Sequence, residues 1–266
     1  MLAAPAPPKT IRPPLKWAGG KRWQVPRLVE VFNRHRHRRL VEPFCGGLAV
    51  VLGLSPARAL LNDANPHLIN FYRWLQRGLV VDIEMRNDEA VYNRQRARFN
   101  ALLRSGGESG PEAAGLFYFL NRTGYNGLCR FNKRGEFNVP FGRYARISYT
   151  RDFTAYAHVL EQWEFSDGDF LGMPIGSEDF VYADPPYDVP FTAYAAGGFS
   201  WDDQVRVAER FSRHAGPVVL VNQATDRIVE LYRRMGYVVD FAEGPRRISC
   251  TGDRTPAKEI VASRNL

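Results

Sequence analysis

The chain has 266 residues, a hydrophobic content of 45%, a formal net charge of +8 and a sequence pI of about 9.6. This size allows one large domain or a domain with a substantial insert, and the apolar runs stay short of the ~18 residues of a membrane-spanning helix. Three widely spaced cysteines, Cys45, Cys129 and Cys250, form no Cys-x-x-Cys or zinc pattern. We therefore expect reduced thiols in a cytoplasm, no metal, and a polyanionic partner for the basic excess.

The first predicted elements follow the order of a nucleotide-binding unit. Residues 1–14, which include five prolines, are expected to form a flexible leader and not a signal peptide. The second predicted strand ends at Asp63, and an acidic residue after strand, glycine turn, helix and strand is typical of a βαβ unit. In chain order these elements are a strand at 40–44, a turn at Gly46 and Gly47, an apolar helix at 48–54 and a strand at 59–62.

A second block of alternating elements begins near Glu164. Its apolar runs and amphipathic stretches predict the remaining strands and helices of the same sheet domain. These are a strand at 179–183, a helix at about 201–215, a strand at 217–222, a helix at about 225–235, a strand at 237–242 and a final edge strand at 258–263.

Between the two blocks, residues 86–147 hold eleven Lys or Arg against five Asp or Glu, a net charge of +6. Within this stretch, glycines, asparagines and aromatics alternate with cations at 117–144, a pattern that favours hairpins and loops. We interpret 86–147 as a basic insert in a parallel-sheet domain made of 15–85 and 148–266. Aromatics interleaved with arginine favour nucleic-acid contact, although a charge run can also be a solvated face.

The buried strand at 179–183 ends in Asp184, Pro185, Pro186 and Tyr187, at the sheet edge where ligands bind in open α/β folds. These residues suit the grip of a flat exocyclic amine. The Asp184 carboxylate and the Pro185 carbonyl can each accept one N–H, which localises the nitrogen lone pair, and two prolines hold that carbonyl still. Tyr187 offers a ring for base stacking. The alternative is a Pro-Pro turn that merely closes a strand.

Together these motifs resemble the Dam-like adenine-N6 DNA methyltransferases, and the resemblance covers nearly the whole chain after the leader. Each motif alone is weak evidence, whereas their order and spacing are specific. The matching segments are 15–21 (LKWAGGK), 41–47 (VEPFCGG), 61–65 (LNDAN), the recognition hairpin at 119–144 and the catalytic tetrad at 184–187 (DPPY).

The resemblance implies S-adenosylmethionine as cofactor and an α/β, Rossmann-like methyltransferase fold with a seven-stranded mixed sheet. It also implies an inserted, mainly helical DNA-recognition domain with a β-hairpin at 86–147. The residues it places at the cofactor are Trp17, Lys21, Phe44, Gly46, Gly47, Asp63, Asp169, Phe170 and Asp184.

Each of these cofactor residues also has a purely structural interpretation. Trp17 can be core and Lys21 a surface cation, and the glycine pair can be an ordinary turn. Asp63 can cap the helix that starts near Pro66, and Asp169 can cap a loop.

By the same resemblance, the target adenine leaves the duplex to reach Asp184, Pro185, Pro186 and Tyr187. Arg130 is expected to read a guanine, and the retained hairpin predicts the site GATC. Arg94, Arg96 and Arg98, with Lys133 and Arg134, are assigned to phosphates or solvent. The expected DNA-binding residues are Tyr125, Asn126, Leu128, Arg130, Asn132, Pro140, Arg143 and Tyr144.

The predicted function is thus transfer of a methyl group to adenine N6 in double-stranded DNA. The alternatives are an N4-cytosine DNA methyltransferase and an inactive sequence-specific DNA-binding protein; protein glutamine methylation would more often go with Asn in place of Asp184. No Pro-Cys pair is present for cytosine-C5 chemistry. We expect a monomeric protein of a bacterial cytoplasm, or a phage-encoded one, with no membrane partner.

Overall fold

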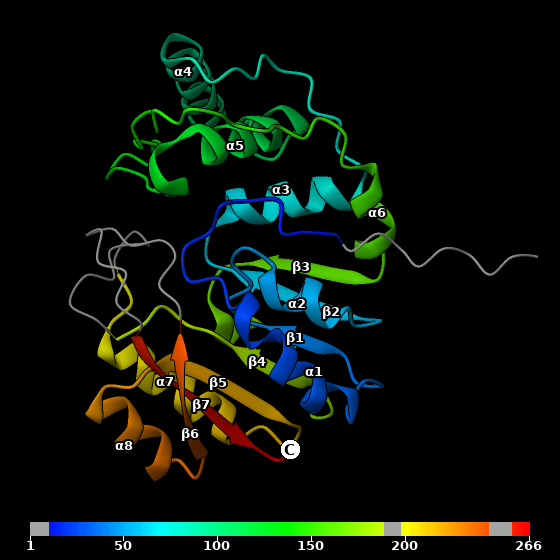
Figure 1. Cartoon of the computed structure of the whole chain (residues 1–266), viewed down its shortest axis with the longest axis vertical. Helices are drawn as coiled ribbons and strands as arrows, with labels where there is room; N and C mark the ends of the chain where they lie inside the picture. Colours follow the sequence, from blue (N-terminus) through cyan, green and yellow to red (C-terminus); the bar gives the residue numbers. More distant parts are fainter. Residues whose placement is uncertain (1–10, 189–197, 245–256) are drawn as a thin grey trace, which may run out of the picture.

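The computed structural model describes residues 11–188, 198–244 and 257–266, and within them the chain forms one seven-stranded sheet (Figure 1). In chain order the strands are β1 (Leu40–Glu42), β2 (Ala59–Asp63), β3 (Trp163–Asp167), β4 (Phe180–Ala183), β5 (Val218–Gln223), β6 (Val238–Gly244) and β7 (Ala257–Arg264). They lie in the order β3-β2-β1-β4-β5-β7-β6. The strands from β3 to β5 are parallel, and β7 is antiparallel to both of its neighbours. The predicted seven-stranded mixed sheet is confirmed.

The central strands are continuous apolar runs because both of their faces are covered. Every residue of β1 and β4 is buried, as parallel strands between two helical layers require. Their side chains alternate between layers, with Leu40 in one hydrophobic cluster and Val41 in the other. The predicted strands at 40–44, 59–62, 179–183 and 217–222 are therefore confirmed, with β1 ending at Glu42.

The prediction of an edge strand at 258–263 is wrong. β7 lies between β5 and β6, and its residues Ile260 and Ala262 are completely buried. β6 is the edge instead, and its Val238 and Phe241 are exposed. The last two strands thus lie in the sheet in the reverse of their order along the chain. The apolar pattern of 258–263 predicts a strand there but not which strands it pairs with.

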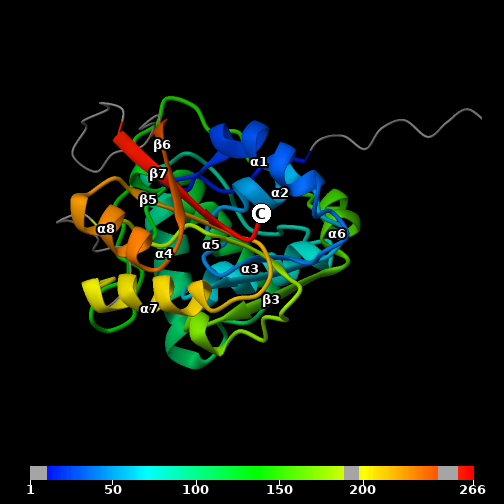
Figure 2. The ribbon, with the colours of Figure 1, turned by 90° about the horizontal axis from the view of Figure 1, so that it is seen from below.

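Helices cover both faces of the sheet (Figure 2). The helices α1 (Val25–Asn33) and α2 (Ala49–Leu54) lie on one face, and α7 (Trp201–Ser212) and α8 (Asp226–Arg234) on the other. Side chains close the first turns of α7 and α8: Ser200 and Asp203 form a capping box, and Thr225 accepts from the Ile228 amide.

A further stack of helices extends the fold beyond the β3 edge. The helix α3 (Pro66–Gln76) packs on β2 and β3, α5 (Pro111–Thr123) packs on α3, and α4 (Glu89–Ser105) packs on α5. The short helix α6 (Thr154–Leu160) closes this stack against α3.

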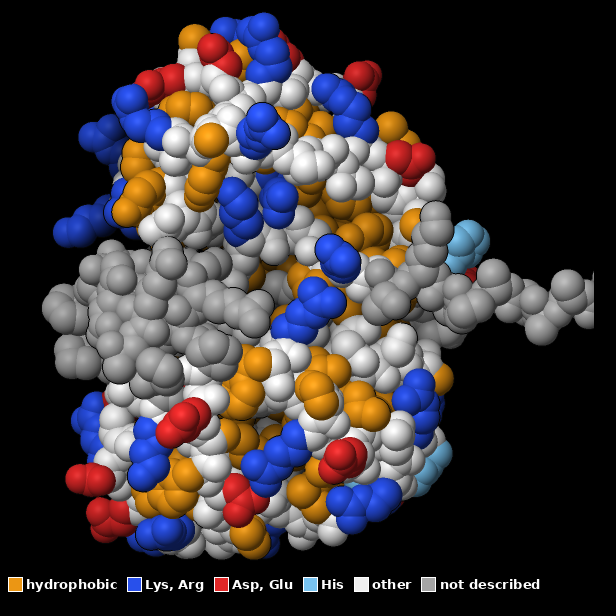
Figure 3. Space-filling model, viewed as in Figure 1, with side chains coloured by type: hydrophobic (Ala, Val, Ile, Leu, Met, Phe, Trp, Pro, Cys, Tyr) orange, Lys and Arg blue, Asp and Glu red, His pale blue; other side chains and the backbone are white. Residues whose placement is uncertain are grey.

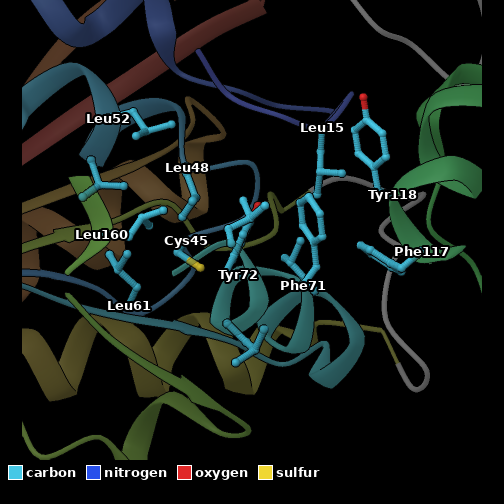
Figure 4. Close-up of a cluster of buried hydrophobic side chains, with 14 of the residues drawn as sticks. Leu15, Cys45, Leu48, Leu52, Leu61, Phe71, Tyr72, Phe117, Tyr118 and Leu160 are labelled. Atoms are coloured by element: carbon cyan, nitrogen blue, oxygen red, sulfur yellow. The ribbon is translucent and has the colours of Figure 1, made fainter. Parts of the chain in front are cut away.

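One hydrophobic core runs from the sheet into this helical stack (Figure 4). Phe71 of α3 stacks on Tyr118 of α5, with ring centroids 5.8 Å apart and an interplanar angle of 14°. Leu15, from the segment before α1, is buried in the same cluster. The helices of the basic stretch are therefore held by apolar contacts with the sheet domain.

The expectation of hairpins and loops throughout 117–144 is wrong for its first part. Residues 117–123 complete α5, because their apolar side chains are buried between α3 and α4. A hairpin follows at 130–138, where Phe131 and Phe137 form an antiparallel bridge. The Asn132 amide oxygen accepts from the backbone of Arg134 and Glu136, which fixes the turn.

Contacts with the folded chain begin inside the range predicted as a leader. Tyr156 of α6 donates to the Arg12 carbonyl at 2.7 Å, and Ile11 packs on the core, while residues 1–10 lie outside the described residues. Within the described ranges, no helix is both long and apolar enough to cross a membrane. The same ranges contain no cluster of three or more His, Cys, Asp or Glu side chains arranged for a metal ion.

Candidate active site

The predicted catalytic tetrad (184–187) and the glycine loop (Gly46 and Gly47) lie after two neighbouring strands, at the point where strand order reverses. β1 and β4 are neighbours, while the chain proceeds from β1 to β2 on one side and from β4 to β5 on the other. Such a switch point opens a crevice at the carboxyl ends of the strands. Gly46 follows β1, Asp63 ends β2, and Asp184 follows β4, so the fold brings the predicted cofactor and catalytic segments to one edge.

Lys21 lies beside the carboxylate of Asp184, the first residue of the predicted tetrad. Its Nζ is 3.4 Å from Oδ2 of Asp184 and 3.8 Å from Oε1 of Glu259, and the lysine side chain is only 4% exposed. The same ammonium donates to the Gly19 carbonyl at 2.7 Å. The alternative of Lys21 as a surface cation is therefore wrong. Glu259 had not been predicted at the site, because the pairing of β7 between β5 and β6 that brings it there is not contained in any local sequence pattern.

Burial dominates the electrostatics of the tetrad. It raises the pKa of Asp184 to about 6, an effect that the Lys21 ammonium opposes and Glu259 reinforces. The Tyr187 ring lies under Lys21, with Nζ 4.5 Å from the ring centroid. Burial, with smaller contributions from Asp184 and Glu259, raises the pKa of the Tyr187 hydroxyl well above its ordinary value. Burial thus favours the protonated phenol and the neutral form of the carboxylate.

The glycine loop packs directly on an indole. Gly46 has a positive φ of 44°, which favours glycine, and a Cβ added there would lie 2.8 Å from Nε1 of Trp17. A Cβ on Gly47 would lie 2.7 Å from the Trp17 Cβ. Both positions therefore require glycine for close packing, which is more than an ordinary strand–helix turn demands.

The Asp63 carboxylate, at the end of β2, is hydrogen-bonded to the same glycine loop. Its carboxylate accepts from the Gly46 amide at 3.2 Å and from the Asn65 amide at 2.9 Å, and burial raises its pKa to about 6. The alternative of Asp63 as a helix cap is wrong, because Asn65 caps α3 by accepting from His67 and Leu68.

Asp169 and Phe170 follow β3 in a short helical turn at Phe170–Gly172. The Asp169 carboxylate caps that turn by accepting from Leu171 and pairs with Arg206 of α7, so it does cap a loop. Phe170 is buried, and its ring lies 5.3 Å from that of Phe44 after β1. The structure therefore gathers the predicted aromatic pair next to the glycine loop.

The predicted DNA-binding residues lie in the segment after α5. Arg130 extends along the hairpin, where it donates to the Asn138 side chain at 2.8 Å and to its carbonyl at 3.1 Å. Tyr125 is 47% exposed, and Asn126 has a left-handed φ of 52° in the turn between α5 and Leu128. The remaining members are Asn132, which holds the hairpin turn, exposed Pro140, Arg143, which pairs with Glu89, and Tyr144, whose hydroxyl donates to Gly124.

The cations of α4 differ from those of the hairpin. Arg94 pairs with Glu84, and Arg98 pairs with Glu112. Their charges are thus partly neutralised within the protein. Lys133 and Arg134 at the hairpin tip are exposed. Figure 3 shows Lys and Arg side chains along the margin where Figure 1 places the loops that follow α5.

Lys16 joins the two predicted sites and was missed by sequence reasoning. Its Nζ lies 3.5 Å from the centroid of the Tyr144 ring and donates to the Arg122 carbonyl at 2.8 Å. Asn121 of α5 exchanges two hydrogen bonds with the Lys16 backbone, at 2.9 and 2.8 Å. Burial and the neighbouring Arg122 lower the pKa of Lys16 to about 8. The position of Lys16 directly before Trp17 was the available signal.

Comparison with known proteins shows which family has this sequence and fold. Residues 17–242 match the model of the D12 class N6 adenine-specific DNA methyltransferases. The chain belongs to this family. The match includes the glycine loop, the helical stack, the hairpin and the catalytic tetrad.

Named relatives of this D12-class methyltransferase come from bacteria and phage. The Retron Ec67 DNA adenine methylase of Escherichia coli is 34% identical over 93% of this chain and 90% of its own length. A DNA adenine methylase of Vibrio cholerae is 36% identical over 93% of this chain and 94% of its own length. The DNA N-6-adenine-methyltransferase of Escherichia phage P1 is 33% identical over 90% of this chain, a match that covers 33% of the phage protein. The chain is therefore an adenine-specific DNA methyltransferase, and the cytosine and inactive alternatives are set aside.

Proposed function

We propose that this D12-class enzyme uses S-adenosylmethionine to methylate adenine N6 within GATC, in double-stranded DNA, by flipping the adenine out of the duplex. The observation that carries the proposal is the placement of Asp184 and Pro185 directly after β4, across the switch point from the glycine loop.

The chain's own groups account for the activation of the amine. The Asp184 carboxylate accepts one N–H and the Pro185 carbonyl accepts the other, so the nitrogen lone pair is drawn out of the ring system. The Tyr187 ring supplies the stacking surface, which is worth roughly 1–3 kcal/mol per base. The new N–C bond would form as the bond between the methyl carbon and the cofactor's sulfur breaks, and the amine proton would then pass to solvent. Ionised Asp184 lies beside the amine to accept a hydrogen bond throughout. Catalysis is then mostly positioning and electrostatic polarisation.

The residues at the sheet edge fit S-adenosylmethionine. The glycine loop brings backbone amides close to a ligand, and Asp63 ends β2 where ribose hydroxyls are bound in nucleotide sites. Phe44 and Phe170 offer apolar surface for an adenine ring, with Asp169 beside them. Trp17 and Lys21 border the catalytic end, where a cation suits a carboxylate. When bound, the cofactor supplies an electrophilic sulfonium methyl group.

Recognition is assigned to the segment after α5, within the insert 86–147 that we propose as the target-recognition unit. Arg130 stands on a hairpin and retains donors beyond those used by Asn138, so it can bridge O6 and N7 of a guanine. The similarity of 119–144 to the recognition hairpin of Dam-like enzymes supports GATC as the site. The exposed Lys133 and Arg134 suit phosphates.

The test is a methyl-transfer assay with labelled S-adenosylmethionine and two duplexes that differ only in one GATC site. We expect label in N6-methyladenine, and only in the duplex that contains GATC. Label in both duplexes would overturn the sequence assignment, and no label in either would overturn the proposed function. Fluorescence of 2-aminopurine at the target position reports base flipping, and we expect it to rise on binding.

A further inference from the structure

Two buried amide side chains lie under the catalytic loop and have no assigned role. Gln204 of α7 is 1% exposed, and Asn222 at the end of β5 is completely buried. Both sit among apolar residues that pack α7 and α8 on the sheet, such as Val207 and Leu220. Amides in such surroundings cost free energy unless their hydrogen bonds are made.

Each amide is bonded in a way that fixes its orientation. Asn222 Nδ2 donates to Oε1 of Gln204 at 2.9 Å and to the Tyr232 hydroxyl at 3.3 Å. Because Oε1 of Gln204 is an acceptor in this pair, its Nε2 must point the other way. That nitrogen donates to the Pro186 carbonyl at 2.8 Å. The order of donors and acceptors therefore leaves one way to place the Gln204 amide.

The same pair holds the loop at a second point. Asn222 Oδ1 accepts from the Asp188 amide at 3.3 Å and from the Gln223 amide at 2.8 Å. The Asp188 side chain is also bound by Thr225 and Arg227 of the α8 end. The backbone of the tetrad is thus tied down on both sides of Tyr187.

These ties bear on the two consecutive proline carbonyls. Both prolines have a fixed φ and lack an N–H, so the direction of each carbonyl depends on one ψ angle per residue. Gln204 engages the Pro186 carbonyl, which directs that oxygen toward α7 and the protein interior. Within the described part of the chain no hydrogen bond reaches the Pro185 carbonyl, which leaves that oxygen for the amine of the target base.

We propose that Gln204 and Asn222 are positioning residues that select the Pro185 carbonyl as the amine acceptor, by holding the Pro186 carbonyl and the Asp188 amide. This inference rests on the proposed function, since it requires the adenine amine at Asp184 and Pro185. The pair does not touch the reacting atoms and acts only through the loop.

The first test replaces Gln204 by Met, which keeps its length and loses both hydrogen bonds. We expect the single-turnover rate of methyl transfer to fall by about 10²-fold, the loss that a misplacement of about 1 Å can cause. Binding of cofactor and DNA should stay close to that of the parent. The matched control is Val207→Ala, which creates a cavity in the same helix and the same core without touching the loop.

A second variant separates positioning from packing. A protonated glutamic acid in Gln204→Glu can accept from Asn222 and donate to the Pro186 carbonyl, whereas the ionised form repels that carbonyl. Among the described residues, the titratable groups bonded to the pair are the Tyr232 hydroxyl and, through its backbone amide, Asp188, whose carboxylate Arg227 neutralises, and the Asp184 carboxylate acts on Tyr232 through its charge. We expect the activity of Gln204→Glu, relative to the parent, to rise as the pH falls, and that of Gln204→Met to show no such rise.

Three results would overturn the inference: an unchanged rate in Gln204→Met, a loss no larger than that of Val207→Ala at equal thermal stability, or equal pH profiles for the Glu and Met variants. The combination of Gln204→Met with Asn222→Leu should lose no more than the larger single loss, because both act on one loop. If the parent enzyme itself transfers no methyl group to duplex adenine, the proposed function fails and this inference falls with it, whereas a parent that transfers beside an unaffected Gln204→Met variant overturns this inference alone.

Discussion

Lys21 and Asp184 form an ion pair at the catalytic edge, with Nζ and Oδ2 3.4 Å apart, the lysine 4% exposed and the carboxylate 20% exposed. The resemblance had placed Lys21 at the cofactor, and the proposed function sets its ammonium against the methionine carboxylate. The pair predicts a second role, which is to keep this partly buried carboxylate ionised. These two roles lead to different measurements.

Asp184→Ala is expected to abolish methyl transfer while DNA binding survives. The carboxylate is one of two acceptors for the amine, whereas the proposed DNA contacts of the segment after α5 do not include it. Single-turnover transfer and a fluorescence-anisotropy titration with a GATC duplex measure the two properties. Retained transfer would refute the role of Asp184, and lost binding would show that the variant disturbs the fold.

Asp184→Asn is expected to stabilise the fold at neutral pH. The folded pKa of about 6 lies above the unfolded value of about 3.9, so the folded state binds this proton more tightly. The favourable contribution is complete below about pH 4 and is lost as the pH rises through about 6, where the buried group ionises. Removing the charge should therefore raise the free energy of unfolding at pH 7.5 by on the order of 1–3 kcal/mol.

Chemical denaturation at pH 7.5 and at pH 4 measures this difference between parent and variant. The stabilisation should shrink at the lower pH, where the parent carboxylate is protonated. A variant that is less stable than the parent at pH 7.5 would mean that the pair with Lys21 outweighs the cost of burying the carboxylate.

Lys21→Met is expected to move the acid limb of methyl transfer to higher pH. Lys21 lowers the pKa of Asp184, so its removal lets burial and Glu259 raise that pKa further. Transfer requires the ionised carboxylate and should therefore fail at a higher pH than in the parent. Single-turnover rates between pH 5 and 9 at saturating cofactor test this, with Lys21→Arg as the variant that keeps the charge.

A role confined to the methionine carboxylate would give another result. The cofactor would bind more weakly to Lys21→Met, and the pH profile at saturation would stay in place. The two outcomes are separable because one changes affinity and the other changes the titration of Asp184.

The fold can be predicted from the sequence wherever a short run of consecutive residues determines the element. The buried runs at 179–183 and 59–62 predict parallel strands, and the residues that follow them predict the site at the carboxyl edge. The position of β7 inside the sheet depends on a pairing between distant strands, which no local pattern contains. For the same reason Glu259 on β7 was missed, although it lies 3.8 Å from Lys21.

The insert shows the second limit of the sequence. Residues 117–123 contain aromatics that favour strands or loops by composition, yet they form a helix because α3 and α4 bury them from opposite sides. From the sequence, Arg94 and Arg98 were assigned to phosphates or solvent, whereas the fold pairs them with Glu84 and Glu112. Charge partners across helices are a property of the tertiary arrangement.

Arg130→Ala is expected to relax specificity at one base pair of the site. A lost bidentate contact to guanine costs roughly 1–3 kcal/mol of discrimination at that position. The matched control is Arg94→Ala, which removes an exposed arginine of the same basic stretch that pairs with Glu84. Transfer rates on duplexes with single-base changes in GATC measure the effect. A uniform loss on all duplexes would mark Arg130 as a phosphate contact.

Gly47→Ala is expected to weaken cofactor binding and DNA recognition together. The added Cβ would lie 2.7 Å from the Trp17 Cβ and 3.2 Å from its Cγ, so the glycine loop and the Trp17 segment must separate. Overpacking of this kind typically costs about 1–3 kcal/mol. Because Lys16 precedes Trp17 and is bonded to Asn121 of α5, the displacement should reach the recognition segment.

Gly172→Ala is the control, since its Cβ would meet no atom within 4 Å. Calorimetric titration with S-adenosylmethionine and transfer rates on altered GATC duplexes measure the two effects, and a loss of cofactor affinity with unchanged sequence preference would show that the Trp17 segment does not couple the two sites.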